Sequence, residues 1–306
     1  MASRRAIAVS PLATLAGGET NLLRLIPALT PHGWATTITV PGEGRLRRSA
    51  EAAGIPVRRL RLGPPERRTP AAYAGAALAV RVLGDCDVAL LNGLSTQRVV
   101  PALAVLGRPA VLVVNNPVES PPRAWRHARQ WTTIRAIAAA SHHTAAECRA
   151  AGAPPERVHV AYAAAWSDGT PPGASTPPPS GSRVGFVGRI EPRKGVLELI
   201  EAARGFLSDR PDATLTIVGD ADDPRGDYAL RVREAAAAPE LHGRVTLAGF
   251  REDAAATMAD FDLVVVPSLH EPYGTVAAEA AATARATVVS AVGGMTEVVI
   301  DGETGL

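Results

Sequence analysis

Two short segments in the second half of the chain carry residue types that can bind phosphate. The first runs Val187-Gly-Arg-Ile-Glu-Pro-Arg-Lys-Gly195 and contains Lys194, the only lysine among 32 basic residues. Arg189 can bind phosphate oxygens through paired N–H donors, Lys194 adds a compact positive charge, and Gly188 lets the backbone approach a ligand. The spacing matches neither a GxGxxG loop nor a P-loop. It predicts a phosphate site, with a solvated basic turn as the alternative.

The second segment runs Pro267-Ser-Leu-His-Glu-Pro-Tyr-Gly-Thr-Val-Ala-Ala-Glu279 and leads into a run of small residues typical of a helix. Gly274 and Thr275 would offer backbone N–H groups to an anion at the start of that helix. Glu279 would lie about one turn inside it, where a carboxylate can accept hydrogen bonds from neighbouring hydroxyls. Glu271 precedes the helix. It would face a sugar, or else be an ordinary acidic residue stabilised by the helix dipole.

Strands and helices are predicted to alternate on both sides of a stretch rich in Pro, Gly and Ser, residues 167–182. Short β-branched runs followed by longer alanine-rich segments are typical of βαβ units and parallel sheets. We therefore predict an α/β protein of two Rossmann-like, doubly wound domains, residues 1–166 and 183–306, with a cleft between them. Residues 167–182 would be a linker, or alternatively a long surface loop. The carboxyl ends of the parallel strands would hold the ligand.

The alternation predicts seven strands in the first domain and five in the second. In the first domain they are Arg5–Ser10, Ala35–Val40, Val57–Leu62, Asp87–Asn92, Ala110–Asn115, Ala136–Ser141 and Val158–Ala163. In the second they are Arg183–Gly188, Thr214–Val218, Val245–Gly249, Leu263–Pro267 and Thr287–Ala291. Several are almost continuously apolar, as expected of strands covered by helices on both faces.

Composition narrows the classes of function. A net charge of +2 gives no support for nucleic-acid binding. Cys86 and Cys148 lie far apart and outside any CxxC pattern, so we expect no disulfide framework or zinc site, and a reducing cytoplasm. The apolar runs are too short for a signal peptide or a membrane span, which leaves peripheral membrane contact open.

Other acidic and histidine pairs are weaker candidates. Three Asp-x-Asp strings begin at Asp85, Asp220 and Asp260, and those at Asp85 and Asp260 abut predicted strands, which favours turn residues over a metal motif. We expect no metal. The pair His142-His143 opens a predicted helix and favours capping or packing over ligation.

The motifs together resemble the retaining glycosyltransferases of the GT-B type, especially family 4. The resemblance lies in Gly188, Arg189 and Lys194, in the Glu-x7-Glu signature from Glu271 to Glu279, and in the segments 293–297 and 301–306. It covers the second domain almost throughout and the first only in outline, at residues 17–19 and 141–147.

The resemblance implies a metal-independent transfer of a sugar from a nucleoside diphosphate, with UDP-sugar favoured, to an acceptor. The anomeric configuration would be retained and no cofactor would be needed. Arg189 and Lys194 would neutralise the departing diphosphate, and Glu271 would contact the donor sugar. The residues implied in donor binding are Gly17, Gly18, Gly188, Phe250, Arg251, His270, Tyr273, Gly274, Thr275 and Glu279.

The sequence departs from the family in two places. Many relatives carry a histidine at the end of the fourth strand, where this chain has Asn92-Gly93, and relatives continue past Leu306, so the chain is either naturally short or a fragment. A nucleotide-sugar epimerase or hydrolase and a non-catalytic donor-binding subunit therefore stay open as alternatives. The acceptor, a glycan, glycolipid or small natural product, is unidentified. Trp125, Trp131 and the Asn115-Asn116 turn are candidates to contact it.

Overall fold

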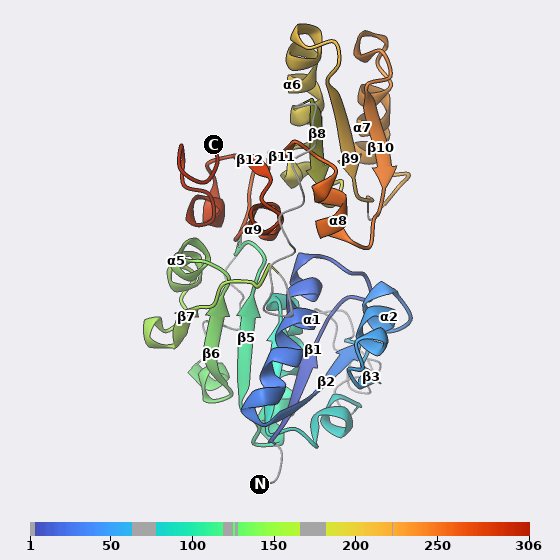
Figure 1. Ribbon diagram of the computed structural model, residues 1–306. Coiled ribbons are helices and arrows are strands. Elements are labelled where there is room, and N and C mark those ends of the chain that lie inside the picture. Colours follow the sequence, from blue (N-terminus) through green and yellow to red (C-terminus); the bar gives the residue numbers. More distant parts are fainter. Residues whose placement is uncertain (1–3, 63–77, 119–124, 126–127, 166–181, 222) are drawn as a thin grey trace. The chain divides into compact units, whose positions relative to one another are not determined.

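The chain divides into two compact units, Met1–Ser167 (unit 1) and Asp168–Leu306 (unit 2). The computed structural model describes residues 4–62, 78–118, 125, 128–165, 182–221 and 223–306. Each unit has its own parallel sheet flanked by helices (Figure 1), so the predicted α/β class is confirmed. Of the predicted linker only Ser182 lies within the described residues, and the domain boundaries stay predictions.

Unit 1 contains a seven-stranded sheet in the order β3-β2-β1-β4-β5-β6-β7, and all its strand pairs are parallel. The strands are β1 (Arg4–Val9), β2 (Trp34–Val40), β3 (Val57–Arg59), β4 (Val88–Asn92), β5 (Ala110–Val114), β6 (Ile134–Ala139) and β7 (Val158–Val160). The strand order reverses between β1 and β4. In a doubly wound sheet, this reversal opens a crevice at the carboxyl ends of the strands, where ligands bind.

Unit 2 contains a five-stranded parallel sheet in the order β10-β9-β8-β11-β12. Its strands are β8 (Arg183–Val187), β9 (Thr214–Val218), β10 (Val245–Gly249), β11 (Leu263–Val266) and β12 (Ala286–Val289). Here the order reverses between β8 and β11. These are the two strands whose following loops carry the phosphate-binding segments predicted from the sequence.

The helices follow the strands as the alternation predicts. Those of unit 1 include α1 (Gly17–Leu29), α2 (Arg45–Ala52), α4 (Val100–Val105) and α5 (His142–Ala150). Those of unit 2 are α6 (Val196–Asp209), α7 (Asp227–Ala236), α8 (Ala254–Ala259) and α9 (Thr275–Ala282). None of the helices in the described residues is long and apolar enough to span a bilayer.

Apolar side chains on both faces of each sheet form the cores. In unit 1, Leu91, Leu112 and Ile137 lie in one cluster and Ile38 in another, and all four are fully buried. In unit 2, Ile217 lies in a cluster beneath α6 and α7. Burial on both faces explains the continuous apolar runs in the sequence and fixes the strand ends, so the loops that follow them are held in place.

Candidate functional site

The loop after β8 concentrates positive charge. Arg189 Nη2 lies 3.2 Å and Arg193 Nη2 2.8 Å from the same carboxylate oxygen, Glu191 Oε1. All three side chains are about one-quarter to one-third exposed. A single carboxylate therefore holds two guanidinium groups in the loop. This leaves the loop with a net positive charge even before Lys194 is counted.

Lys194 lies in direct contact with Glu271, which comes from the loop after β11. The distance from Lys194 Nζ to Glu271 Oε2 is 2.5 Å, and both side chains are largely buried, at 14% and 11% exposure. The hydroxyl of Ser268 also donates to Glu271 Oε2, at 3.2 Å. An ammonium group has three donors. Within the described residues Lys194 uses one of them, on Glu271, so two stay available to a ligand.

Two glycines allow the loops after β8, β11 and β12 to meet. A Cβ on Gly195 would lie 2.0 Å from the carbonyl oxygen of Pro267, and one on Gly293 would lie 2.0 Å from that of Glu271. Both glycines have left-handed backbones, with φ of +66° and +57°. Side chains at either position would force the loops apart. The backbone of Glu271 is held further by a 2.9 Å hydrogen bond from the N–H of Gly294.

The segment from Tyr273 to Glu279 forms the start of α9. Gly274 is the N-cap residue, with φ of +99°, and Thr275 is the first helical residue. Glu279 lies one turn into the helix, as predicted, and is 8% exposed. Burial, and secondarily the nearby carboxylate of Glu297, raises the pKa of Tyr273, so this phenol is protonated at neutral pH.

The other predicted donor residues of unit 2 also follow strand ends. Gly188 directly follows β8, and its N–H donates to the carbonyl oxygen of Val218 at 2.9 Å. Phe250 is half-buried and Arg251 exposed directly after β10, while His270 is half-buried beside Glu271. A shallow hollow borders the loop after β8. Its lining residues are Arg189, Ile190, Glu191, Pro192, Ala221, Asp223 and residues 226–229.

In unit 1, Gly17 and Gly18 begin α1, directly after the loop that follows β1. Asn92 is the last residue of β4 and is buried, at the place where the family resemblance expects a histidine. Trp125 and Trp131 are buried in the core of unit 1, with ring centroids 5.8 Å apart. Both rings pack in the core of unit 1, and their contact with an acceptor stays a prediction.

Two of the Asp-x-Asp strings have structural roles. Asp87 Oδ2 accepts a hydrogen bond from the N–H of Arg5 at 2.7 Å, and Asp262 Oδ2 accepts one from the N–H of Arg183 at 2.8 Å. Each aspartate precedes a central strand and ties its start to the neighbouring strand. The interpretation of these strings as turn residues is confirmed.

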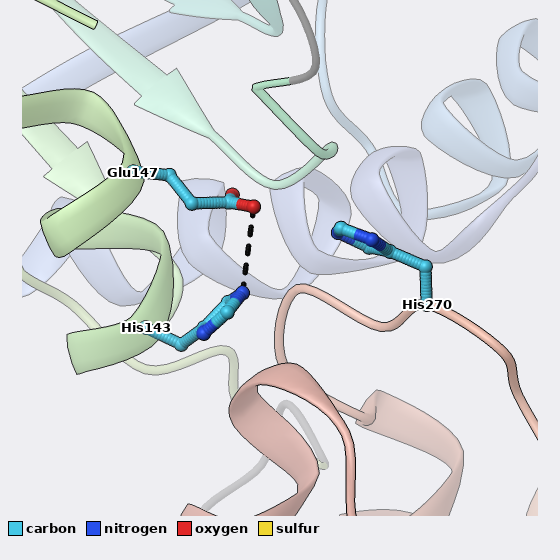
Figure 2. Close-up of side chains that lie close together, drawn as sticks. All are labelled: His143, Glu147 and His270. Carbon is cyan, nitrogen blue, oxygen red and sulfur yellow. Dashed lines mark ion pairs between the residues drawn. The ribbon is translucent and has the colours of Figure 1, made fainter. Parts of the chain in front are cut away.

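The cap of α5 is Ser141, whose hydroxyl oxygen accepts from the N–H of Thr144 at 3.0 Å. Figure 2 shows His143 and Glu147 on successive turns of α5, with a contact of 3.4 Å that is an ion pair when the imidazole is protonated. The third side chain drawn, His270, belongs to unit 2. Within unit 1, the pair His143–Glu147 stabilises the surface of its own helix.

Three polar residues of the candidate site were not singled out from the sequence. Glu191 and Arg193 lie inside the first phosphate-binding segment, and Ser268 lies inside the second. The signal for Glu191 and Arg193 was the alternation of charge in Arg-Ile-Glu-Pro-Arg-Lys. Ser268 gave no such signal, because its contact with Glu271 depends on the turn of the loop.

The sequence of unit 2 matches a known protein family. Residues 181–306 match the family model described as glycosyl transferases group 1. Unit 2 therefore carries a glycosyltransferase group 1 domain. The two parallel-sheet units have the fold of GT-B glycosyltransferases, shown by the structure of Anabaena Alr3699/HepE in complex with UDP-glucose. That structure has a TM-score of 0.83 and 24% identity, covering 99% of this chain and 84% of that one.

Two curated relatives are similar in sequence to parts of this chain. The alpha-maltose-1-phosphate synthase of Mycobacterium tuberculosis (strain H37Rv) is 42% identical over 127 residues, which are 39% of this chain and 31% of the relative. The D-inositol 3-phosphate glycosyltransferase of Jonesia denitrificans is 33% identical over 177 residues, 50% of this chain and 40% of the relative. The matches thus span about a third of the relatives' length.

Proposed function

We propose that this chain is a retaining glycosyltransferase of the family 4 type, which transfers a hexose from a UDP-sugar to an acceptor hydroxyl without a metal or other cofactor. The observation that carries the proposal is the contact between Lys194 and Glu271, 2.5 Å apart at the strand-order reversal of unit 2. It unites a phosphate-binding cation with a sugar-binding carboxylate. Each belongs to one of the two segments on which the family resemblance depends.

Lys194 would act on the leaving group. As the bond between the anomeric carbon and the diphosphate oxygen breaks, negative charge grows on the diphosphate. The two N–H donors that Lys194 does not use within the described residues would bind the diphosphate oxygens, and Arg189 would add a guanidinium. The charge of this largely buried ammonium would stabilise the diphosphate more strongly than an exposed charge, because less water screens it.

Glu271 would orient the donor sugar. Its carboxylate is held by Lys194 and Ser268 through the same oxygen, Oε2, so Oε1 is the atom suited to accept from sugar hydroxyls. Glu279 would accept from the ribose hydroxyls in the same way. The acceptor oxygen would then bond to the anomeric carbon, and the departing diphosphate would take the acceptor's proton.

The relatives and structural neighbours support the choice of donor class. One solved neighbour is in complex with UDP-glucose, and the curated relatives are named for glycosyl transfer or for the synthesis of a sugar phosphate. The loop after β8 contributes Arg189, Arg193 and Lys194, three basic residues suited to a diphosphate.

The test is UDP release from a panel of UDP-hexoses, with and without a panel of sugar acceptors, in the presence of EDTA. We expect release that depends on the acceptor and is unchanged by EDTA, and a product whose anomeric configuration, measured by proton NMR, matches that of the donor. UDP release without acceptor would instead indicate a hydrolase. Release by none of the panel, with bound UDP detected, would indicate a non-catalytic donor-binding protein.

A further inference from the structure

Ser268 is a fully buried serine in the loop that follows β11, three residues before Glu271. It is 0% exposed, and its hydroxyl donates to Glu271 Oε2 at 3.2 Å. The same oxygen accepts from Lys194 Nζ at 2.5 Å. One carboxylate oxygen therefore receives two donors, which come from the loops after β11 and β8.

The backbone of the turn from Ser268 to Glu271 is held by neighbouring loops at both ends. The N–H of Leu269 donates to the carbonyl oxygen of Arg193 at 2.8 Å, and the N–H of Gly294 donates to that of Glu271 at 2.9 Å. These bonds tie the turn to the loops after β8 and β12. A hydroxyl carried by so constrained a backbone keeps one position relative to the sheet.

A single contact with Lys194 would leave the Glu271 carboxylate free to turn. The terminal torsion of a glutamate side chain is broad, and an ammonium on a flexible four-carbon stem can follow the carboxylate as it turns. A second donor from a rigid turn removes this freedom, because it fixes the plane of the carboxylate. With Oε2 held from two directions, Oε1 has a defined position.

We infer that Ser268 is a positioning residue for the donor sugar, because its hydroxyl fixes the plane in which Glu271 Oε1 accepts from a hexose hydroxyl. A hydrogen bond weakens steeply when its angle is poor, so this plane decides how strongly the sugar is bound. The Ser268 hydroxyl is buried and acts only through Glu271. The inference rests on the proposed function, in which Glu271 binds the sugar.

The ratio of UDP-hexose affinity to UDP affinity tests this role, measured by calorimetry on the full chain. Ser268→Ala should lower the ratio about tenfold, the scale of one hydrogen bond to a charged group, and change UDP affinity less than about twofold. Thr283→Val is the matched control, since it also removes a buried hydroxyl of unit 2, which donates to the carbonyl oxygen of Ala280 at 2.9 Å. An unchanged ratio in Ser268→Ala, or equal losses for UDP and UDP-hexose, would overturn the inference.

A double-mutant cycle separates positioning from a merely structural role. Glu271→Ala removes the carboxylate on which Ser268 acts. In that background, Ser268→Ala should change the affinity ratio less than about twofold, because residues that act through one contact are not additive. A further tenfold fall would mean that Ser268 acts independently of Glu271, and the inference would fail.

A measurement without ligand distinguishes failure of this inference from failure of the proposed function. Lys194 is the only lysine of the chain, so ¹³C-labelled lysine gives a single side-chain Cε signal that reports on the contact with Glu271. Ser268→Ala should shift this signal, and Thr283→Val should leave it in place. An unmoved signal in Ser268→Ala would refute the positioning role alone. A shifted signal in a protein that binds no UDP-hexose would contradict the proposed function, and with it the role toward the sugar.

Discussion

The two units have the same kind of sheet but opposite chemistry where their strand order reverses. In unit 2 the reversal point holds Arg189, Arg193 and Lys194 against the carboxylates of Glu191 and Glu271. In unit 1 it holds one carboxylate, Glu19, and two amides. The strand order reverses in both units, and the side chains at each reversal decide what can bind there. The three basic residues of unit 2 suit the diphosphate that we propose for it.

The largest effect is expected from removing the cation of unit 2. Lys194→Ala should lower UDP-sugar turnover about 100- to 1,000-fold, the range seen when one donor to a developing oxyanion is lost. Steady-state kinetics measure this. Arg204→Ala is the matched control, since Arg204 also lies in unit 2 but pairs with Glu201 on the surface of α6. Equal turnover in Lys194→Ala and Arg204→Ala would show that Lys194 contributes no more to catalysis than a surface arginine.

A strong loss of stability is expected where the loops of unit 2 meet. Gly293→Val places a Cβ against the carbonyl oxygen of Glu271 in a left-handed backbone, and we expect about 3 kcal/mol of destabilisation. Urea unfolding measures the change. Gly205→Ala is the control, because Gly205 lies inside α6 with open space around it and should be neutral or slightly stabilised. An unchanged free energy of unfolding in Gly293→Val would show that the fold does not need the close contact between Gly293 and the carbonyl oxygen of Glu271.

Glu271→Gln should separate the two effects of the Glu271 carboxylate, which are neutralisation of Lys194 and binding of the donor sugar. The side chain keeps its size but no longer neutralises Lys194, so bare UDP should bind about threefold more tightly. Turnover should nevertheless fall about tenfold, because the amide holds the donor sugar's hydroxyls less strongly than the carboxylate. Calorimetry and kinetics on the same preparation measure both. Parallel loss of UDP binding and turnover would mean that Glu271 serves only to position Lys194.

The smallest effect concerns the two cysteines, both buried in unit 1. Burial, with the nearby Glu147 carboxylate second, raises the pKa of the Cys148 thiol to about 12. A raised pKa contributes stability that is complete below pH 9 and is lost as the pH rises toward 12. We expect both thiols to react with a disulfide reagent only on unfolding of unit 1 at pH 7. Fast reaction of native protein at that pH would contradict the burial of Cys148.

Much of the fold was predictable from the sequence because burial on both faces of a parallel sheet leaves an apolar run. Each of the predicted strands is present. The boundaries were less accurate, since Val57–Leu62 was predicted where β3 ends at Arg59. β3 is an edge strand paired on one side only, so fewer hydrogen bonds extend it.

The candidate site was predictable in its residue types but not in its contacts. The sequence singled out Lys194 and Glu271 separately, and only the fold brings them together across 77 positions. The hydrogen bonds that link Glu19, Asn92 and Asn115 in unit 1 illustrate the same limit. Gly18, Asn92 and Asn115 each drew attention from the sequence, but their alignment depends on three strands being neighbours. The burial of Trp125 and Trp131 likewise follows from tertiary packing, which a single sequence does not display.

The presence of one lysine allows the central claim to be tested at a single atom. Biosynthetic incorporation of ¹³C-labelled lysine gives one side-chain Cε signal, from the unmodified Lys194. If Lys194 binds the diphosphate, UDP should shift this signal in proportion to occupancy, and uridine should leave it in place. A Lys194 signal that does not move with saturating UDP, in protein shown to be folded, would contradict the account.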